Sequence, residues 1–265
     1  MKKGIAMESL VTIILIVVGL LVLLAFTVQL IGKSNETLHD RMCTYSAILN
    51  SVMNSRISCS PKPVVISTDG VKVMGHDKRV LIGDRYLKTF KPADFEEAVK
   101  YTIADQMFRC WDMMGSGNLN LFATDIAQKN HVCMLCSDIM FDNKAREQQI
   151  LGLDKYMDEK YVTQYKLDKT YTQALSSKIY QYQWKFLYLP IYSGDVSSLG
   201  IPTGQVINTD DNYKVVFVAY KSSFLSNYFG KKLGINLGEY KQDAVYFVYL
   251  YSNEDFRKNC PVKYN

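Results

Sequence analysis

Histidine is scarce in this chain, with three residues among 265, and these are His39, His76 and His131. Histidine is the usual general base of a catalytic triad and a common metal ligand, so few ways remain to build either site. There is no HxxxH pair and no second CxxC to complete a zinc site. Gly115 and Gly117 lack the lysine and the helix start of a phosphate-binding loop. We therefore expect no enzyme, no metal and no cofactor.

A strong charge of one sign is also missing. The net charge is +5, and basic residues alternate with acidic ones instead of forming a run, so nothing indicates a nucleic-acid partner. We find no internal repeat and no low-complexity stretch. A hydrophobic share of 48% with 22% charged residues is typical of a folded chain, and 19 Tyr and 12 Phe can build a sizeable core.

Residues 10–31 contain neither a charge nor a proline. At about 1.5 Å per residue, a helix of this length crosses the ~30 Å hydrocarbon layer of a bilayer. The segment is longer than the apolar part of a secretory signal and has a poor cleavage site after it. Lys2 and Lys3 precede it, whereas basic residues after it are diluted by acidic ones, which predicts a cytoplasmic N-terminus. We expect a single-pass membrane protein in contact with lipid.

A second helical pattern follows this segment. Apolar residues recur at intervals of 4, 3, 4 and 3, the spacing of one stripe along a helix, at Leu38, Met42, Tyr45, Leu49 and Val52. No proline lies between Glu8 and Arg56, so one continuous helix of about 70 Å is expected, half hydrophobic and half amphipathic. Two interpretations of the stripe stay open: it packs on the chain's own head, or it contacts a helix of another subunit.

The first residues combine the basic Lys2 and Lys3, then Gly4, then Glu8 as the one acidic residue before the apolar stretch. This combination resembles the class III signal of type IV pilins and related archaeal surface proteins. The resemblance implies cleavage between Gly4 and Ile5, a helix that forms a filament core, and a role for Glu8 in subunit docking. Such cleavage would make Glu8 the fourth mature residue, where the family usually has its glutamate at the fifth.

The helical sequence pattern ends at residue 57. We therefore place a boundary there, between a membrane anchor and helical stalk, 1–57, and an extracytoplasmic head, 58–265. Asp94 and Glu97 have the spacing of a capping box, and an apolar face follows them until Gly115 ends the helix. We expect further helices at 144–160 and 170–179, and strands at 64–67, 71–74, 79–82, 133–142, 182–189, 213–220 and 244–251. The predicted class is α+β, with a long N-terminal helix that carries a disulfide-stapled head.

All the cysteines follow the predicted span: Cys43, Cys59, Cys110, Cys133, Cys136 and Cys260. An even number outside the cytoplasm predicts disulfides. Proximity in sequence favours Cys43 with Cys59, and Cys110 with either Cys133 or Cys136, which leaves Cys260 for the remaining partner. A second hypothesis uses Cys133 and Cys136 as half of a zinc site or as a redox pair, and reduced or metal-bound cysteines would favour it.

Two shorter features remain. Residues 110–122, CWDMMGSGNLNLF, together with the CxxC resemble a block in membrane-anchored proteins of small-genome archaea, which implies no particular activity. Within the block, Trp111 and Phe122 are expected in the core. Asn35 begins an Asn-Glu-Thr sequon just outside the predicted span and is a candidate glycosylation site.

These features predict a pilin-like structural subunit of a cell-surface filament, tube or other appendage. Its partners would be membrane lipid and copies of itself or related subunits, which it meets through the N-terminal helix. The alternative is a single-pass, membrane-anchored binding or adhesion module that presents its head to an envelope or cell-surface partner. An extracytoplasmic CxxC enzyme is the third hypothesis.

Overall fold

A computed structural model describes residues 17–18, 35–165, 167–175, 206–223, 244–260 and 263–264. The chain divides into two compact units, Met1–His39 and Asp40–Asn265, so the larger unit begins before the expected boundary at residue 57. Of the predicted span, only Val17 and Val18 are described, and both are helical. Gly4, Ile5 and Glu8 lie outside the described residues. Within the described ranges, no helix combines the length and the apolar character that crossing a bilayer requires.

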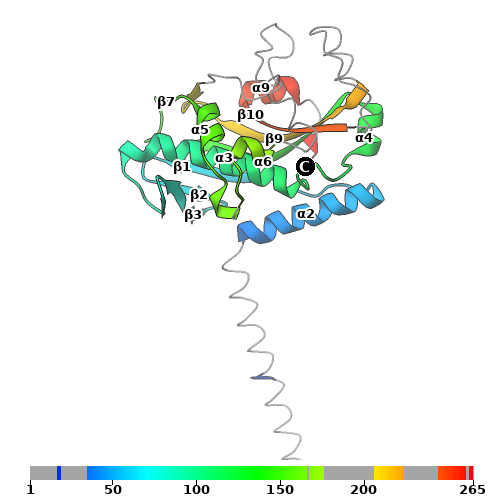
Figure 1. The fold of residues 1–265 in the computed structure, drawn as a ribbon, viewed down its shortest axis with the longest axis horizontal. Helices are drawn as coiled ribbons and strands as arrows, with labels where there is room; N and C mark the ends of the chain where they lie inside the picture. Colours follow the sequence, from blue (N-terminus) through cyan, green and yellow to red (C-terminus); the bar gives the residue numbers. More distant parts are fainter. Residues whose placement is uncertain are drawn as a thin grey trace, which may run out of the picture. The chain divides into compact units, whose positions relative to one another are not determined.

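The larger unit is built on a seven-stranded sheet with strand order β10-β9-β6-β1-β2-β3 (Figure 1). Neighbouring strands on this path are antiparallel except for β1 and β6, which are parallel, and β11 also runs parallel to β6. The strands are β1 (Lys62–Ser67), β2 (Gly70–Val73), β3 (His76–Lys78), β6 (His131–Phe141), β9 (Tyr213–Lys221), β10 (Ala244–Ser252) and β11 (Lys263–Tyr264). The central strands were all expected from the sequence.

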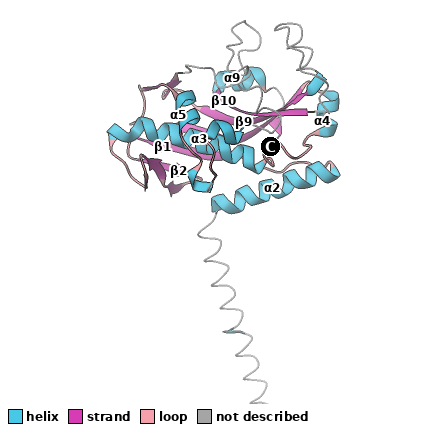
Figure 2. Cartoon of the chain, viewed as in Figure 1, coloured by secondary structure: helices cyan, strands magenta, loops and turns pink. Residues whose placement is uncertain are grey.

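Helices and two small sheets complete the mixed α+β fold, and Figure 2 draws the helices in cyan and the strands in magenta. The helices are α2 (Asn35–Met53), α3 (Phe95–Met113), α4 (Ala123–Gln128), α5 (Leu153–Glu159), α6 (Tyr171–Leu175) and α9 (Asn253–Asn259), with 3-10 turns at Pro92–Asp94 and Thr163–Tyr165. The small sheets pair β4 (Val80–Ile82) with β5 (Arg85–Leu87), and β7 (Gln149–Ile150) with β8 (Ile207–Asn208). The α+β class is therefore confirmed.

Helix α3 occupies the centre of the core, as its apolar periodicity predicts. It ends at Met113, and Gly115 follows two residues later with a φ of +76°, a conformation that other residues rarely adopt; a Cβ there would lie 2.4 Å from Cγ of Leu119. The expected capping box is wrong. A 3-10 turn precedes α3, so Asp94 itself has helical backbone angles and its side chain does not cap the helix. Glu97 instead accepts a hydrogen bond from the backbone N–H of Gly83.

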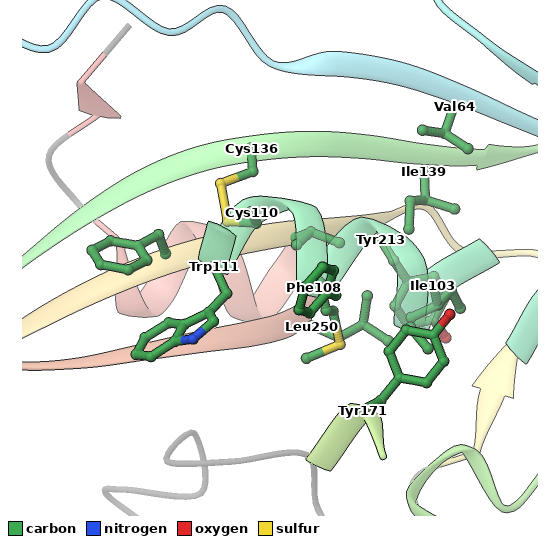
Figure 3. Packing of buried hydrophobic residues seen from close by; sticks show 14 of the residues in the cluster. Val64, Ile103, Phe108, Cys110, Trp111, Cys136, Ile139, Tyr171, Tyr213 and Leu250 are labelled. Atoms are coloured by element: carbon green, nitrogen blue, oxygen red, sulfur yellow. A yellow bond between two sulfur atoms is a disulfide. The ribbon is translucent and has the colours of Figure 1, made fainter. Parts of the chain in front are cut away.

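The sheet has a buried cluster on each face. On one face α3 packs against β6, β9 and β10, and Trp111 lies against Phe217 with their ring centroids 6.1 Å apart. Figure 3 shows the disulfide that links Cys110 on this helix to Cys136 on β6. On the other face, tyrosines and valines of β9 and β10 pack with Phe256 of α9. Burial raises the pKa of Tyr220 in this second cluster to about 12.

The helix expected at 144–160 is largely wrong, because only Leu153–Glu159 is helical. Asp142 accepts hydrogen bonds from the backbone N–H groups of Lys144 and Ala145, which makes a turn where a helix was expected. The following residues form β7, which pairs with β8, a strand that is distant in sequence. Of the helix expected at 170–179, Tyr171–Leu175 is observed; the rest, and the strand expected at 182–189, lie outside the described residues.

The disulfide pairs include the expected Cys43 with Cys59 and decide the alternative left open for Cys110, which is bonded to Cys136. The pairs are Cys43–Cys59, Cys110–Cys136 and Cys133–Cys260. The first joins α2 to the segment before β1, the second joins α3 to β6, and the third joins β6 to the end of α9. By the chain-entropy estimate for the loops they close, each contributes about 3 to 5 kcal/mol to stability.

Candidate functional site

Helix α2 is attached to the head by polar and covalent contacts. Asp40 accepts hydrogen bonds from Nζ of Lys62 at 2.8 Å and from Nη1 of Arg109 at 2.9 Å. Arg109 also donates through Nε to Asp105, which accepts a further bond from Lys78 at 2.9 Å. These five side chains connect α2, β1, α3 and β3 in one network of charges. Asp40 of α2 is therefore held by ions that are largely removed from water.

The network depends on Asp105, whose side chain is 1% exposed. Burial acts to raise the pKa of this carboxyl, but the positive charges of Lys78 and Arg109 outweigh it and hold the pKa below its usual range. Lys62 is fully buried as well. Charges this deep are tolerated only in pairs, because an unpaired buried ion costs several kcal/mol.

The middle and the end of α2 have their own attachments. The disulfide from Cys43 to Cys59 fixes the middle. Near the end, the side-chain carbonyl of Asn50 accepts a hydrogen bond from the backbone N–H of Phe122 at 2.9 Å, and its amide group donates to the carbonyl of Ser55. Phe122 has a left-handed backbone conformation, with φ of 59°. The inward side of α2 thus includes Asp40, Cys43, Ala47 and Asn50, at intervals of 3, 4 and 3, and Ser46 beside them accepts a hydrogen bond from the backbone N–H of Ser58.

The opposite side of α2 is an exposed apolar surface, which we call the outer face. Its members with their exposed fractions are Leu38 (44%), Met42 (65%), Tyr45 (64%), Ile48 (43%), Val52 (75%) and Met53 (70%). Leu49 is half-buried and Arg41 is an exposed charge on the same side. Four of the five stripe side chains are therefore exposed and do not pack on the described part of the head, and Leu49 alone is half-buried. The reason is that Asp40, Cys43 and Asn50 turn the other side of the helix inward.

Cys133 and Cys136 do not act as a pair. The register of β6 against β9 shifts between Leu135 and Ser137, so Cys136 is the extra residue of a β-bulge. Cys133 belongs to the cluster on one face of the sheet and Cys136 to the cluster on the other. Each is bonded to a distant cysteine. This arrangement contradicts the hypothesis that the two cysteines bind zinc or exchange electrons with each other.

Other candidate sites are weaker than the outer face. In the part of the chain that the structure describes, no cluster of His, Cys, Asp and Glu is placed to hold a metal ion. A shallow polar hollow is lined by Asp211, Ser252, Asn253, Glu254, Arg257 and Lys258. There Glu254 and Lys258 are exposed and form an ion pair with each other, so the hollow has no strong net charge to attract a ligand. Asn35 is the first residue of α2.

No protein-family model, no curated protein and no solved structure matches this chain. The outer face of α2 is the feature that most needs a functional explanation. Monomeric proteins rarely leave a row of large apolar side chains in water, and such rows usually mark a contact surface.

Proposed function

We propose that this chain is a pilin-like structural subunit of a cell-surface filament or tube. Hydrophobic residues 10–31 anchor it and assemble with copies of themselves, and the outer face of α2 contacts a second copy. The observation that supports this proposal most is the exposure of Met42, Tyr45, Val52 and Met53, which are all more than half exposed on a helix that is otherwise firmly attached. An attachment made through ions, a disulfide and Asn50 leaves the apolar side free for a partner.

The size of the outer face explains why the hydrophobic segment is also needed. A stable protein interface buries ~800 Å² on each partner and takes about 20–30 residues a side. About six side chains on one helix fall well short of that, so two free heads would associate weakly. Association of residues 10–31 would bring the helices together and make the second contact effectively intramolecular. The outer face begins only a few residues after this segment, at Leu38.

The type of residue also fits a helix partner better than a soluble ligand. Methionine, isoleucine and valine offer no directional hydrogen bonds, so they recognise another apolar surface by packing. Tyr45 adds a large ring near the middle of the face. Copies that leave the same membrane have the same direction, which makes a parallel α2 pair the simplest arrangement. A coiled-coil-like seam follows from the intervals of 3 and 4.

A pair of charge insertions tests this proposal. Ile48→Glu with Val52→Glu places two carboxylates on the outer face, and Thr124→Glu with Gln128→Glu places two on the exposed side of α4 at the same spacing. Both full-length variants are expressed in membranes and imaged by negative stain. We expect filaments or tubes from the wild type and the α4 variant, and small particles from the α2 variant with all disulfides formed.

Two outcomes would contradict the proposal. If the α2 variant assembles as the control does, the outer face is not a subunit contact. If the wild type itself gives only small detergent particles that start at Met1, the alternative is favoured, in which the chain is a single-pass membrane-anchored binding or adhesion module.

A further inference from the structure

Two of the three disulfides are connected to each other through a short stretch of chain. Cys136 and Cys133 lie three positions apart on β6, and they are bonded to Cys110 and Cys260 respectively. The Cys43–Cys59 bond forms a separate ring at α2. A covalent path from α2 to residue 260 therefore needs only the chain from 59 to 110 and the short piece from 133 to 136.

This connectivity decides what a single backbone cut can separate. A cut between 43 and 59 leaves both ends joined through the first disulfide. A cut anywhere between 110 and 260 leaves the pieces joined through one or both of the others, because two rings share the segment 133–136. Between α2 and residue 260, the stretch 59–110 is thus the one place where a single cut divides the protein.

Much of that stretch is protected, although the turns around Gly75 and Gly83 and the segment before α3 are exposed. It contains β1, whose Val64 and Ile66 are fully buried, and nearly all of α3, whose inward side chains form the centre of the core. The hairpins in it have tight turns, such as the one at Gly83. Proteases cut exposed loops and locally unfolded segments in preference to core strands and helices. Of the longer described connections, 114–122 and 142–148 lie inside disulfide rings, whereas 88–94 does not.

We infer that the three disulfides together have a retention function: they keep the head covalently attached to α2 after proteases cut its surface loops. A protein exposed outside the cell meets proteases, and a cut loop would otherwise allow part of the head to leave when the fold opens. The chemistry needs no cofactor, because the pairs are already oxidised. This inference concerns the link between α2 and the head, so it holds whether or not the chain forms filaments.

The test introduces one specific protease site into the full-length chain, which carries a C-terminal tag. In one variant the site is inserted between Asp210 and Asp211, an exposed turn inside the third ring. In the other it is inserted between Gly83 and Asp84, in the stretch outside every ring. Free thiols are blocked, the protein is opened in urea without reductant so that both sites are accessible, and it is cleaved and run on denaturing gels.

For the Asp210 variant we expect the tag to stay at full size without reductant and to move to a short fragment with it. For the Gly83 variant the tag should leave the N-terminal piece under both conditions. Removing the third disulfide by Cys133→Ala with Cys260→Ala should make the Asp210 variant fall apart without reductant. The inference is overturned if the Asp210 variant separates without reductant while its disulfides are intact, or if the Gly83 variant does not separate.

Discussion

Replacing Asp105 by asparagine should destabilise the head strongly. The amide keeps the shape of the carboxyl but removes its charge, so Lys78 and Arg109 lose a negative partner at 2.9 and 3.1 Å. The side chains of these cations are only 11% and 10% exposed, so water does not replace the lost charge. Breaking a buried pair from one side typically costs about 3–5 kcal/mol, and we expect a loss in that range at pH 7.

The pH dependence of this loss separates a charge effect from a packing effect. The folded-state pKa of Asp105 is lowered, so the stability that its charge provides is present above the unfolded-state pKa and is lost as the pH falls through the folded-state pKa. Below both values the wild type carries a neutral acid that resembles the amide. The difference between wild type and Asp105→Asn should therefore shrink in acid.

Urea titration of the full-length protein in detergent, at pH 7 and at successively lower pH, measures both quantities. Glu96→Gln is the control, because Glu96 is 56% exposed and its pairing with Lys100 should contribute at most about 1 kcal/mol. A loss below about 1 kcal/mol for Asp105→Asn at pH 7, or a loss that does not change with pH, would refute the description of this network as a buried set of mutually dependent charges.

Three further predictions concern the attachment of α2, the core and assembly. Asn50→Ala should lower the free energy of unfolding by about 2–4 kcal/mol, because it removes two hydrogen bonds and leaves the N–H of Phe122 buried. Faster hydrogen exchange at the Phe122 amide would show this loss, and unchanged exchange would argue against the contact. Gly115→Ala should lower the urea midpoint, because a Cβ there meets Leu119 and φ is positive, whereas an unchanged midpoint would mean that the helix end is adaptable. Glu8→Ala should leave head stability unchanged but reduce assembly, as seen by negative stain, and normal assembly would count against the pilin-like proposal.

The sequence predicts much of this fold, because the strongest signals are local. The periodic apolar face of α3 and the aromatic runs of β9 and β10 are recognisable without any tertiary information. The segment 144–152 was misjudged because its composition permits a helix, whereas Asp142 and the pairing of β7 with β8 decide otherwise. Asp142 is a local signal that was overlooked, whereas β8 is distant in sequence.

The predicted disulfide between Cys43 and Cys59 already implies which side of α2 faces the head. On a helix, Cys43 points well away from Tyr45 and Val52, so a disulfide from Cys43 to the head requires the apolar stripe to face outward. Asp40 and Asn50 lie three residues before and seven residues after Cys43, so a helix places them on the same inward side. The identity of their partners could not be predicted, because Arg109 and Phe122 are brought near α2 only by the tertiary fold.

The central claim, that the outer face of α2 contacts a second copy, is tested most directly by photo-crosslinking in membranes. A photoreactive phenylalanine analogue replaces Tyr45 in one variant and Tyr161, which is 51% exposed on the head, in the control. We predict a product of twice the 30.3 kDa chain mass from the Tyr45 position, with the crosslink in α2 of the second copy, and little from Tyr161. Monomer or lipid adducts alone from the Tyr45 position would contradict the account.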